Sequence, residues 1–181
     1  MTELSLYLLD IVHNSIRAKA TEIDVNIIES EMDDTLKIKI EDNGCGMTIE
    51  TAEKALDPFF TTRTTRKVGM GLALLKMLAE QTGGTLTLDS KLNVGTVLHV
   101  HFGLTHLDRP EWGDLPGTMQ SLLSGNPHVV FKYSHKRNDN AFEISTTEIK
   151  EAIPDIPIED VRVSKMIGEI IEGNLCELGI V

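Results

Sequence analysis

The sequence predicts an α/β sandwich of the α+β class, in which helices cover one face of a mixed, mostly antiparallel sheet. Two observations lead to this fold class. Along the first 102 residues, segments of helical and strand-like periodicity follow in the order helix, strand, strand, helix, helix, strand, strand. The 181 residues are also 41% hydrophobic and 25% charged, the ordinary range for a globular chain that buries a core. A small α+β extension is expected after this unit.

The first helix and four strands are predicted from periodicity. Residues 3–18 carry apolar side chains at helical spacing, which indicates an amphipathic helix. Residues 21–29 and 35–42 alternate apolar and polar side chains, as strands with one face in water do. The same alternation returns in residues 85–90 and 95–102 around a polar turn, which indicates a hairpin.

Two further helices are predicted from their boundary residues. Thr48 is a suitable N-cap for a short helix over 48–56. A second helix is predicted over about 70–82, where Gly83 and Gly84 provide the stop. We therefore expect residues 1–102 to form one domain.

Residues 103–181 are predicted to form a C-terminal extension of this domain, with a hairpin and helices. It opens with a Pro/Gly-rich connection over 103–117. Beyond it, residues 128–134 and 140–149 flank a turn-like segment and suggest a hairpin. Two roles are open for the extension: a module that docks a partner, or an extension that packs against the sheet.

Helices are also predicted within this extension. Ser145 and Glu148 have the spacing of a capping box at the start of a short helix. A last helix is predicted from one apolar stripe and is expected to end at Gly173-Asn174. Its stripe consists of Val163, Met166, Ile167, Ile170 and Ile171.

Charge and composition narrow the classes of partner. The formal net charge is -11, which disfavours nucleic acid because a phosphate backbone is repelled. No apolar run approaches the roughly 20 residues that span a bilayer, so we expect no membrane segment. Cys45 and Cys176 are too few for a disulfide framework or a metal cluster, and a cytoplasmic location is expected.

Three polar residues share one face of the first helix. Asp10, Asn14 and Arg17 have i, i+4, i+7 spacing and lie opposite Val12. A carbonyl oxygen suits a hard cation such as Mg2+, a guanidinium suits phosphate, and a carboxylate can deprotonate a nucleophile. The alternative is a solvated charged face, which is the commoner meaning of such a stripe.

A strand-end aspartate before two glycines forms a second candidate motif. Asp42 can accept a hydrogen bond from an exocyclic amine, and Gly44 and Gly46 allow the backbone to approach a flat ring. Aspartates before glycines are also common turn formers, so this motif alone is weak. The same holds for Gly95-Thr96, which opens the last strand of the domain.

A basic cluster stands out in this acidic chain. Residues 61–67 combine three cations with four hydroxyls, and the glycine pair Gly69 and Gly71 follows at the start of a helix. The N–H groups at a helix N-terminus bind phosphate well, and glycine permits close approach. The cluster therefore indicates a site for an anion.

In this order and spacing the motifs resemble the GHKL superfamily: the gyrase, heat-shock chaperone, histidine kinase and mismatch-repair ATPases with the Bergerat ATP-binding fold. The resemblance covers roughly residues 1–102. It is carried by Asp10-x-x-x-Asn14, Asp42-x-Gly44-x-Gly46, the Phe59-Phe60 box, Gly69-x-Gly71 and Gly95-Thr96. "PFFTTR" followed by "GMGLALLKMLAEQTGG" looks closest to the ATP-binding domain of bacterial sensor histidine kinases.

The resemblance implies ATP and Mg2+ as cofactors. It assigns recognition of the adenine amine to Asp42, with Gly44, Gly46 and Thr96 beside it. The anion that the basic cluster would bind is then the triphosphate of ATP.

It also implies how the metal and the phosphates are held. Asn14 would ligate Mg2+ and Arg17 would contact phosphate. Gly69, Gly71 and Leu72 would line the phosphate side.

An ATP lid is implied over about residues 61–69, with Arg63 and Lys67 among its ATP-binding residues. The lid is expected to close over the triphosphate.

Asp10 departs from the sensor kinases, which usually carry asparagine there. A carboxylate at this position resembles the general base of gyrase-type ATPases and of anti-sigma-factor serine kinases, which makes Asp10 the candidate catalytic residue. No H-E-x-x-x-P-type phosphoacceptor helix is found, and the second catalytic lysine of the gyrase and mismatch-repair proteins is not expected in the extension.

Two functions follow as hypotheses. One is an ATP-Mg-dependent regulatory protein kinase or ATPase of histidine kinase-like type that acts in trans on a protein partner. The other is a nucleotide-gated protein-binding regulator without phosphotransfer. A homodimer is compatible with both.

Overall fold

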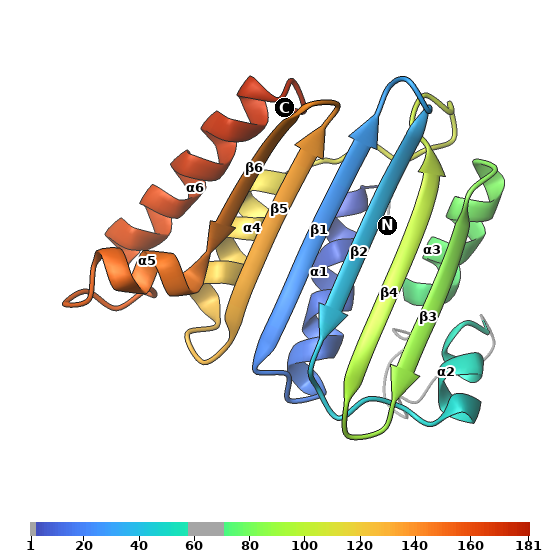
Figure 1. Cartoon of the computed structure of the whole chain (residues 1–181), viewed down its shortest axis with the longest axis horizontal. Helices are drawn as coiled ribbons and strands as arrows, with labels where there is room; N and C mark the ends of the chain where they lie inside the picture. The colour runs from blue at the N-terminus through green and yellow to red at the C-terminus, as the bar shows by residue number, and fades with distance from the viewer. Residues whose placement is uncertain (1–2, 58–70) are drawn as a thin grey trace.

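The computed structural model describes residues 3–57 and 71–181, and these form one six-stranded sheet with helices against it (Figure 1). The strand order is β3-β4-β2-β1-β5-β6. All neighbouring strands pair antiparallel except β1 and β5, which pair parallel. The strands are β1 (Glu22–Ser30), β2 (Thr35–Asp42), β3 (Thr85–Lys91), β4 (Gly95–Gly103), β5 (Val130–Arg137) and β6 (Asn140–Ser145).

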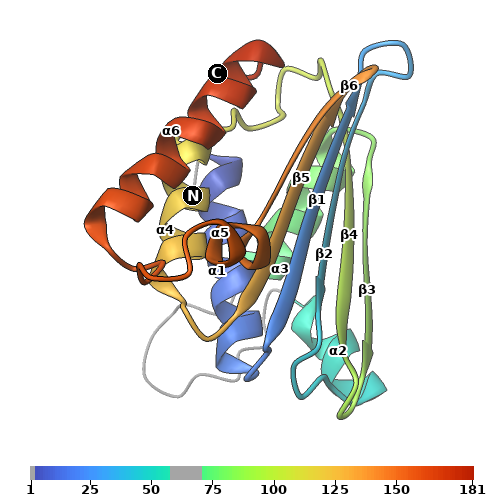
Figure 2. The same ribbon diagram turned by 60° about the vertical axis from the view of Figure 1, so that its left-hand side comes forward.

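The long helices lie on one face of this sheet, as Figure 2 shows with the sheet seen nearly edge-on. The opposite face carries none of the helices within the described ranges. The helices are α1 (Leu4–Arg17), α2 (Ile49–Ala55), α3 (Gly71–Gln81), α4 (Leu115–Gly125), α5 (Thr146–Ala152) and α6 (Val161–Glu177). The predicted α+β class with helices on one face is therefore confirmed.

The core forms between the helices and the alternate strand residues that face them. In β1, for example, Ile23, Val25 and Ile27 are buried, whereas the residues between them point to the open face. Helix α1 contributes the buried side chains Leu8 and Val12 from its apolar stripe. Apolar side chains recur at every second residue in the strands and about every 3.6 residues in the helices. These side chains thus pack against one another in one apolar layer.

The region beyond residue 102 continues the same sheet. Strand β5 pairs with the first strand of the chain, and β5 and β6 form the expected hairpin. Helix α4 packs against both α1 and α6. The extension therefore packs as part of the sheet and its helix layer, which is one of the two roles left open by the sequence.

One helix of this region was not foreseen, and one expectation was wrong. Helix α4 was not predicted, although Asp114 caps it through a hydrogen bond from the Gly117 N–H and a proline stands in its first turn. Helix α6 does not end at Gly173-Asn174 but continues to Glu177. Gly173 does not end the helix, because a glycine inside a helix costs only about 0.8–1.0 kcal/mol relative to alanine.

A buried polar cluster joins the extension to β1. The Glu29 carboxylate accepts hydrogen bonds from the Trp112 indole N–H at 2.8 Å and from His135 Nε2 at 3.2 Å. The Tyr133 hydroxyl lies 2.9 Å from His135 Nδ1. Burial by itself raises the pKa of Glu29, but the hydrogen bonds from His135 and Trp112 outweigh it and hold that pKa below its ordinary value.

Candidate functional site

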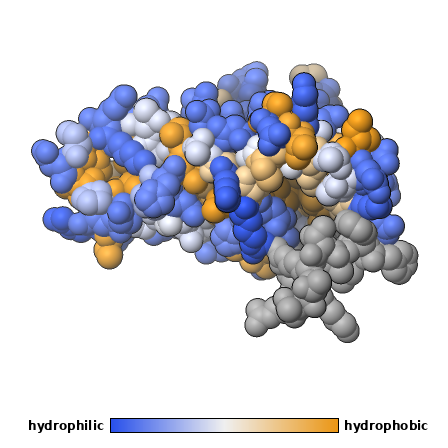
Figure 3. Space-filling view, turned by 90° about the horizontal axis from the view of Figure 1, so that it is seen from below, coloured by the Kyte–Doolittle hydropathy of each residue, from blue (hydrophilic) through white to orange (hydrophobic). Residues whose placement is uncertain are grey.

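A cavity of about 260 Å³ opens between α1, α2, the start of α3 and the strand ends of the sheet. Most of the residues that line it are apolar, with a few polar groups at fixed places, as in small-molecule sites generally. Viewed from below, pale and orange residues of this end of the molecule are framed by hydrophilic side chains (Figure 3). The lining residues are Asp10, Ile11, Asn14, Ser15, Ala18, Ile40, Asp42, Cys45, Gly46, Met47, Thr51, Ala55, Gly71, Leu72, Leu88, Thr96 and Leu98.

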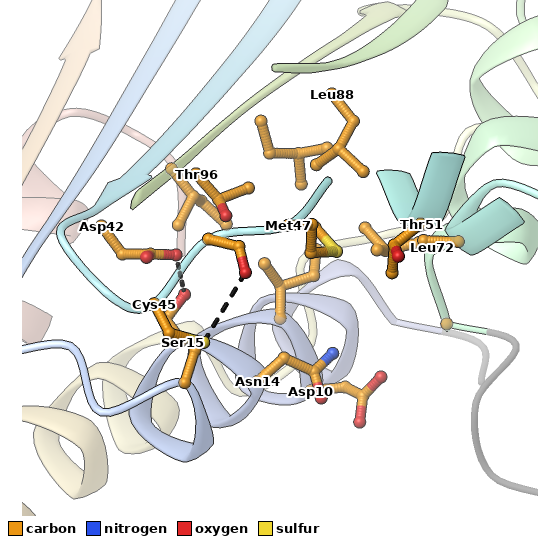
Figure 4. A pocket seen from close by; sticks show the side chains of 17 residues that line it. Asp10, Asn14, Ser15, Asp42, Cys45, Met47, Thr51, Leu72, Leu88 and Thr96 are labelled. Carbon is orange, nitrogen blue, oxygen red and sulfur yellow. Dashed lines mark hydrogen bonds between the residues drawn. The ribbon is translucent and has the colours of Figure 1, made fainter. Parts of the chain in front are cut away.

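Helix α1 brings Asp10 and Asn14 to this cavity. They lie one turn apart on the same face, as their spacing predicts, and both are half-buried (Figure 4). Arg17 is exposed and does not line the cavity, but its guanidinium donates a hydrogen bond to Asn14 Oδ1 at 3.1 Å. Within this stripe the guanidinium and the amide are therefore hydrogen-bonded to each other, and the carboxylate lines the cavity one turn before the amide.

Asp42, the last residue of β2, lines the cavity from the side of the sheet. Its Oδ2 accepts a hydrogen bond from the Ser15 hydroxyl at 2.6 Å, and its Oδ1 accepts one from the Gly44 N–H at 2.9 Å. Both oxygens therefore act as acceptors from donors that hold the carboxylate in place. An ionised carboxylate has further acceptor positions and can accept another hydrogen bond from a ligand N–H.

The sheet register places Thr96 beside Asp42. The two residues are direct partners across β2 and β4, and Ser90 on β3 is the next residue of the same row. The Ser90 hydroxyl lies 2.9 Å from the Thr96 hydroxyl and accepts a hydrogen bond from the Met47 N–H at 2.9 Å. Ser90 thus ties the loop after β2 to the wall of the cavity.

The loop after β2 packs closely on the β3–β4 turn, and Gly46 makes this possible. Gly46 has φ +61°, and a Cβ there would lie 2.0 Å from the Lys91 carbonyl oxygen. The Cys45 carbonyl accepts a hydrogen bond from the Asn93 N–H at 2.7 Å. The glycine is required for this backbone contact, a reason that differs from the expected approach to a ligand ring. Gly44 does not line the cavity, but it holds Asp42 through its N–H.

The phosphate side of the predicted site is described only in part. Gly71 and Leu72, the first residues of α3, line the cavity. The predicted lid and its ligands Arg63, Lys67 and Gly69 lie outside the described residues, as does the Phe59-Phe60 box.

Sequence reasoning missed Ser15, although it holds Asp42. Ser15 is 5% exposed and faces the cavity from the same helix as Asn14. The apolar walls, including Met47 and Leu88, were also not foreseen. A signal existed for Ser15, because a serine inside the buried face of an amphipathic helix needs a hydrogen-bond partner.

No cluster of three or more His, Cys, Asp or Glu side chains that could hold a metal ion exists within residues 3–57 and 71–181. Mg2+ commonly uses one or two protein oxygens and completes its shell with substrate phosphates and waters. The side-chain oxygen of Asn14 fits such a sparse site, whereas a metal bound by protein alone does not fit.

A helix layer on one face of the sheet, with a largely apolar cavity that carries a few polar groups, is an arrangement in which an α+β domain can hold a small ligand between its helices and its sheet. A family model described as histidine kinase-, DNA gyrase B-, and HSP90-like ATPase matches residues 2–106. The chain belongs to this ATPase family. The resemblance drawn from its motifs is thereby confirmed.

Curated relatives match the chain over part of their own length. A putative sensor protein of Shewanella frigidimarina is 30% identical over 108 residues, which is 59% of this chain and 16% of that protein. A probable C4-dicarboxylate sensor kinase of Halalkalibacterium halodurans is 32% identical over 96 residues, 51% of this chain and 18% of that protein. The histidine protein kinase SaeS of Staphylococcus aureus is 30% identical over 106 residues, 55% of this chain and 30% of that protein.

Solved structures share the fold at 17% sequence identity. The MutL ATPase domain of Aquifex aeolicus, complexed with ADP, has a TM-score of 0.51 and covers 84% of this chain and 68% of that one. The N-terminal domain of a DNA repair protein has a TM-score of 0.55 and covers 80% of this chain and 52% of that one. Both shares exceed residues 2–106, so the common fold includes part of the extension. The described helices include none long and apolar enough to span a bilayer.

Proposed function

We propose that this chain binds ATP with Mg2+ in the α1–β2 cavity and acts as a regulatory protein kinase or ATPase of histidine kinase-like type on a protein partner. One observation carries the proposal: Asp10 and Asn14 line, one turn apart, the same cavity as the strand-end Asp42. A carboxylate, a metal-binding oxygen and an amine acceptor thus converge on one ligand volume.

The adenine end is assigned to Asp42 and its neighbours. Asp42 is held by Ser15 and Gly44 and has acceptor capacity left for the exocyclic amine. The Thr96 hydroxyl lies in the same row of the sheet and is the second polar group on this wall. Apolar side chains of the lining, such as Met47 and Leu88, suit the faces of a purine.

The phosphate end is assigned to α1 and the start of α3. Asn14 would ligate Mg2+, Arg17 would contact phosphate, and Gly71 and Leu72 would border the phosphates. Bound Mg2+ supplies neutralisation of charge on the phosphates. The proposed roles of Arg63, Lys67 and Gly69 as lid residues remain predictions from the sequence.

Asp10 is proposed as the general base. It lies on the cavity side of α1, where it can accept a proton from a protein hydroxyl or from water at the phosphate end. Removing that proton would make the oxygen a nucleophile toward the γ-phosphorus of ATP, whose bond to the bridging oxygen would break and leave ADP. Asn14 on the next turn would hold the metal beside these phosphates.

Incubation with ATP labelled on the γ-phosphate, with and without cell extract, tests this proposal. We expect Mg2+-dependent release of labelled phosphate or its transfer to an extract protein, and loss of both in Asp10→Asn. Tight ATP binding with neither release nor transfer would contradict the enzyme and favour the nucleotide-gated protein-binding regulator.

A further inference from the structure

The connection between β4 and α4 is tied to the rest of the fold by hydrogen bonds. Residues 104–114 cross the helix side of the sheet at the end where α1 begins (Figure 2). The Leu104 N–H donates to the Asp34 carbonyl at 3.1 Å. The Arg109 guanidinium donates to the carbonyls of Leu104 at 2.6 Å and of Pro110 at 3.1 Å. A segment held in this way can fix the position of an element that it contacts.

Helix α1 takes its N-terminal cap from this connection. The first four N–H groups of a helix have no partner inside it, and the side chain of the N-cap residue Glu3 makes no capping hydrogen bond. The Leu4 N–H donates instead to the Glu111 carbonyl at 2.9 Å. The Ser5 N–H donates to the Trp112 carbonyl at 3.0 Å. The extension thus supplies a cap that the N-cap side chain of α1 does not.

The chain turns directly after this contact and enters α4. Gly113 has φ +67°, and a Cβ there would lie 2.1 Å from a carboxylate oxygen of Glu3, so a larger residue does not fit this approach. Asp114 then caps α4, which packs against α1. The extension therefore contacts α1 both at its first turn and along its side.

Trp112 is also anchored on the sheet. Its side chain is buried, and its indole N–H donates to the Glu29 carboxylate on β1 at 2.8 Å. Its ring lies edge-on to His135 on β5, with 5.6 Å between the ring centroids. One residue therefore joins three elements: its backbone carbonyl binds α1, and its side chain binds β1 and packs on β5.

Helix α1 has a second polar link to the sheet near its other end, where the Ser15 hydroxyl donates to Asp42 at 2.6 Å. Between the two links, apolar side chains such as Leu8 and Val12 pack on the sheet. Apolar packing is non-directional, whereas hydrogen bonds depend on distance and angle. The two polar links therefore define the position of α1 more narrowly than packing alone.

Asp10 and Asn14 lie at different distances from these links. Asp10 is five residues from Ser5 and five from Ser15, which is about 7.5 Å along the helix in each direction. Asn14 directly precedes Ser15. If the first turn were released, α1 would pivot about the Ser15–Asp42 contact. Asp10 would then move about five times as far as Asn14, because its lever arm is about 7.5 Å against 1.5 Å.

We propose that Trp112 is a positioning residue that fixes the first turn of α1 on the sheet and thereby holds Asp10 at the phosphate end of the cavity. The role of Asp10 in this inference rests on the proposed function, whereas the attachment of α1 does not. A misplacement of about 1 Å far from the chemistry can lower a rate about 10²-fold. The extension then serves the ATP site itself, in addition to completing the sheet.

Trp112→Phe tests the inference, because it keeps an aromatic ring and removes the N–H that binds Glu29. Without nucleotide, amide exchange measured by NMR should become at least about tenfold faster at Leu4 and Ser5, and should change less than about twofold at Ser15. In assays with Mg-ATP, kcat should fall at least about tenfold, while ATP affinity stays within a few-fold.

A second replacement guards against a variant that does not fold. Trp112 is the one tryptophan of the chain, so benzothienylalanine can be incorporated at this position alone. It keeps the bicyclic ring and has sulfur in place of the N–H, and it should reproduce both effects. Circular dichroism checks that each protein is folded.

The matched control is Tyr133→Phe. It removes a hydroxyl that lies 2.9 Å from His135 in the same buried cluster, and it leaves the hydrogen bond between Trp112 and Glu29 in place. We expect lower stability but unchanged exchange at Leu4 and unchanged kcat. If Trp112 contributed only stability, the Tyr133 and Trp112 variants would behave alike, and that outcome would overturn the inference.

Two further results would also overturn it. Unchanged exchange at Leu4 and Ser5 in both Trp112 variants would show that Trp112 does not hold α1. Faster exchange with an unchanged kcat would show that the attachment does not position Asp10. A wild type that neither bound nor turned over ATP would contradict the proposed function instead, and the exchange rates, which need no nucleotide, would still decide whether Trp112 holds α1.

Discussion

Ser15 and Asp42, 27 residues apart in the chain, are joined by a hydrogen bond of 2.6 Å from the serine hydroxyl to Asp42 Oδ2. This contact connects α1, which carries Asp10 and Asn14, to the strand that carries the proposed adenine acceptor. One buried hydroxyl therefore adds a direct polar link between the two halves of the candidate site, beside the apolar packing of α1 on the sheet.

Ser15→Ala should lower ATP affinity about tenfold, because a hydrogen bond to a charged group contributes about 1.5–3 kcal/mol and Asp42 would lose one of its two fixed positions. Calorimetric titration measures the effect, and Ser15→Thr should recover most of it. Ser5→Ala is the matched control, since Ser5 is also buried on α1 but its hydroxyl has no partner. Equal affinities in Ser15→Ala and the wild type would refute the positioning role.

Asn14→Ala should weaken Mg-ATP far more than metal-free ATP, because the proposed role of Asn14 is to ligate the ion. Titrations with Mg2+ and with a chelator give the two affinities. His13→Ala serves as control, since His13 is exposed on the same helix and does not line the cavity. Equal losses under both conditions would mean that Asn14 contributes to the site without binding metal.

Asp10→Asn should retain ATP affinity within a few-fold while turnover or phosphotransfer falls by about two orders of magnitude or more. A general base typically contributes about 10²–10⁴-fold to rate, and asparagine keeps the size of the side chain but not its basicity. Single-turnover assays with labelled ATP measure the rate. Asp139→Asn, in the exposed β5–β6 turn, should be unchanged. Unaltered turnover in Asp10→Asn would remove Asp10 from the catalytic role.

The cluster around Glu29 should make stability depend on acid pH. The pKa of Glu29 is held below its ordinary value of 4.5, so the folded state favours the ionised carboxylate. This contribution is fully present above pH 4.5 or so and is lost as the pH falls below it, because the unfolded chain takes up the proton first. Urea unfolding followed by Trp112 fluorescence at pH 7 and pH 4 measures the loss.

Glu29→Gln is the matching variant. It should be less stable than the wild type at pH 7, since the buried hydrogen bonds to His135 and Trp112 are weakened, and its stability should fall less between pH 7 and pH 4. The same pH slope in both proteins would show that Glu29 does not account for the acid sensitivity.

The sequence predicts the first half of the fold well because its patterns are local. Alternation in β1 and β2 and the Thr48 cap of α2 need no tertiary information. Helix α4 was not predicted, because its first turn contains Pro116 and Gly117 and these residues are typical of a Pro/Gly-rich connection. The parallel pairing of β5 with β1 joins segments about 100 residues apart. Such a contact cannot be predicted from the pattern of neighbouring residues.

The candidate site was predicted to a similar degree. Asp10, Asn14, Asp42 and Thr96 were expected together and do line one cavity. Ser15 and Ser90 were missed, because their importance lies in hydrogen bonds across elements rather than in any motif.

The most direct test of the account is an ATP titration of Asp42→Asn beside the wild type. Asparagine keeps one oxygen for the Gly44 N–H but replaces the other with a donor, so the adenine amine meets no acceptor there. We predict a loss of roughly 1.5–3 kcal/mol, or about tenfold to a hundredfold in affinity, with the fold intact by circular dichroism. GTP, which lacks that amine, should bind the wild type poorly. Undiminished ATP affinity in Asp42→Asn would contradict the assignment of this cavity as the ATP site.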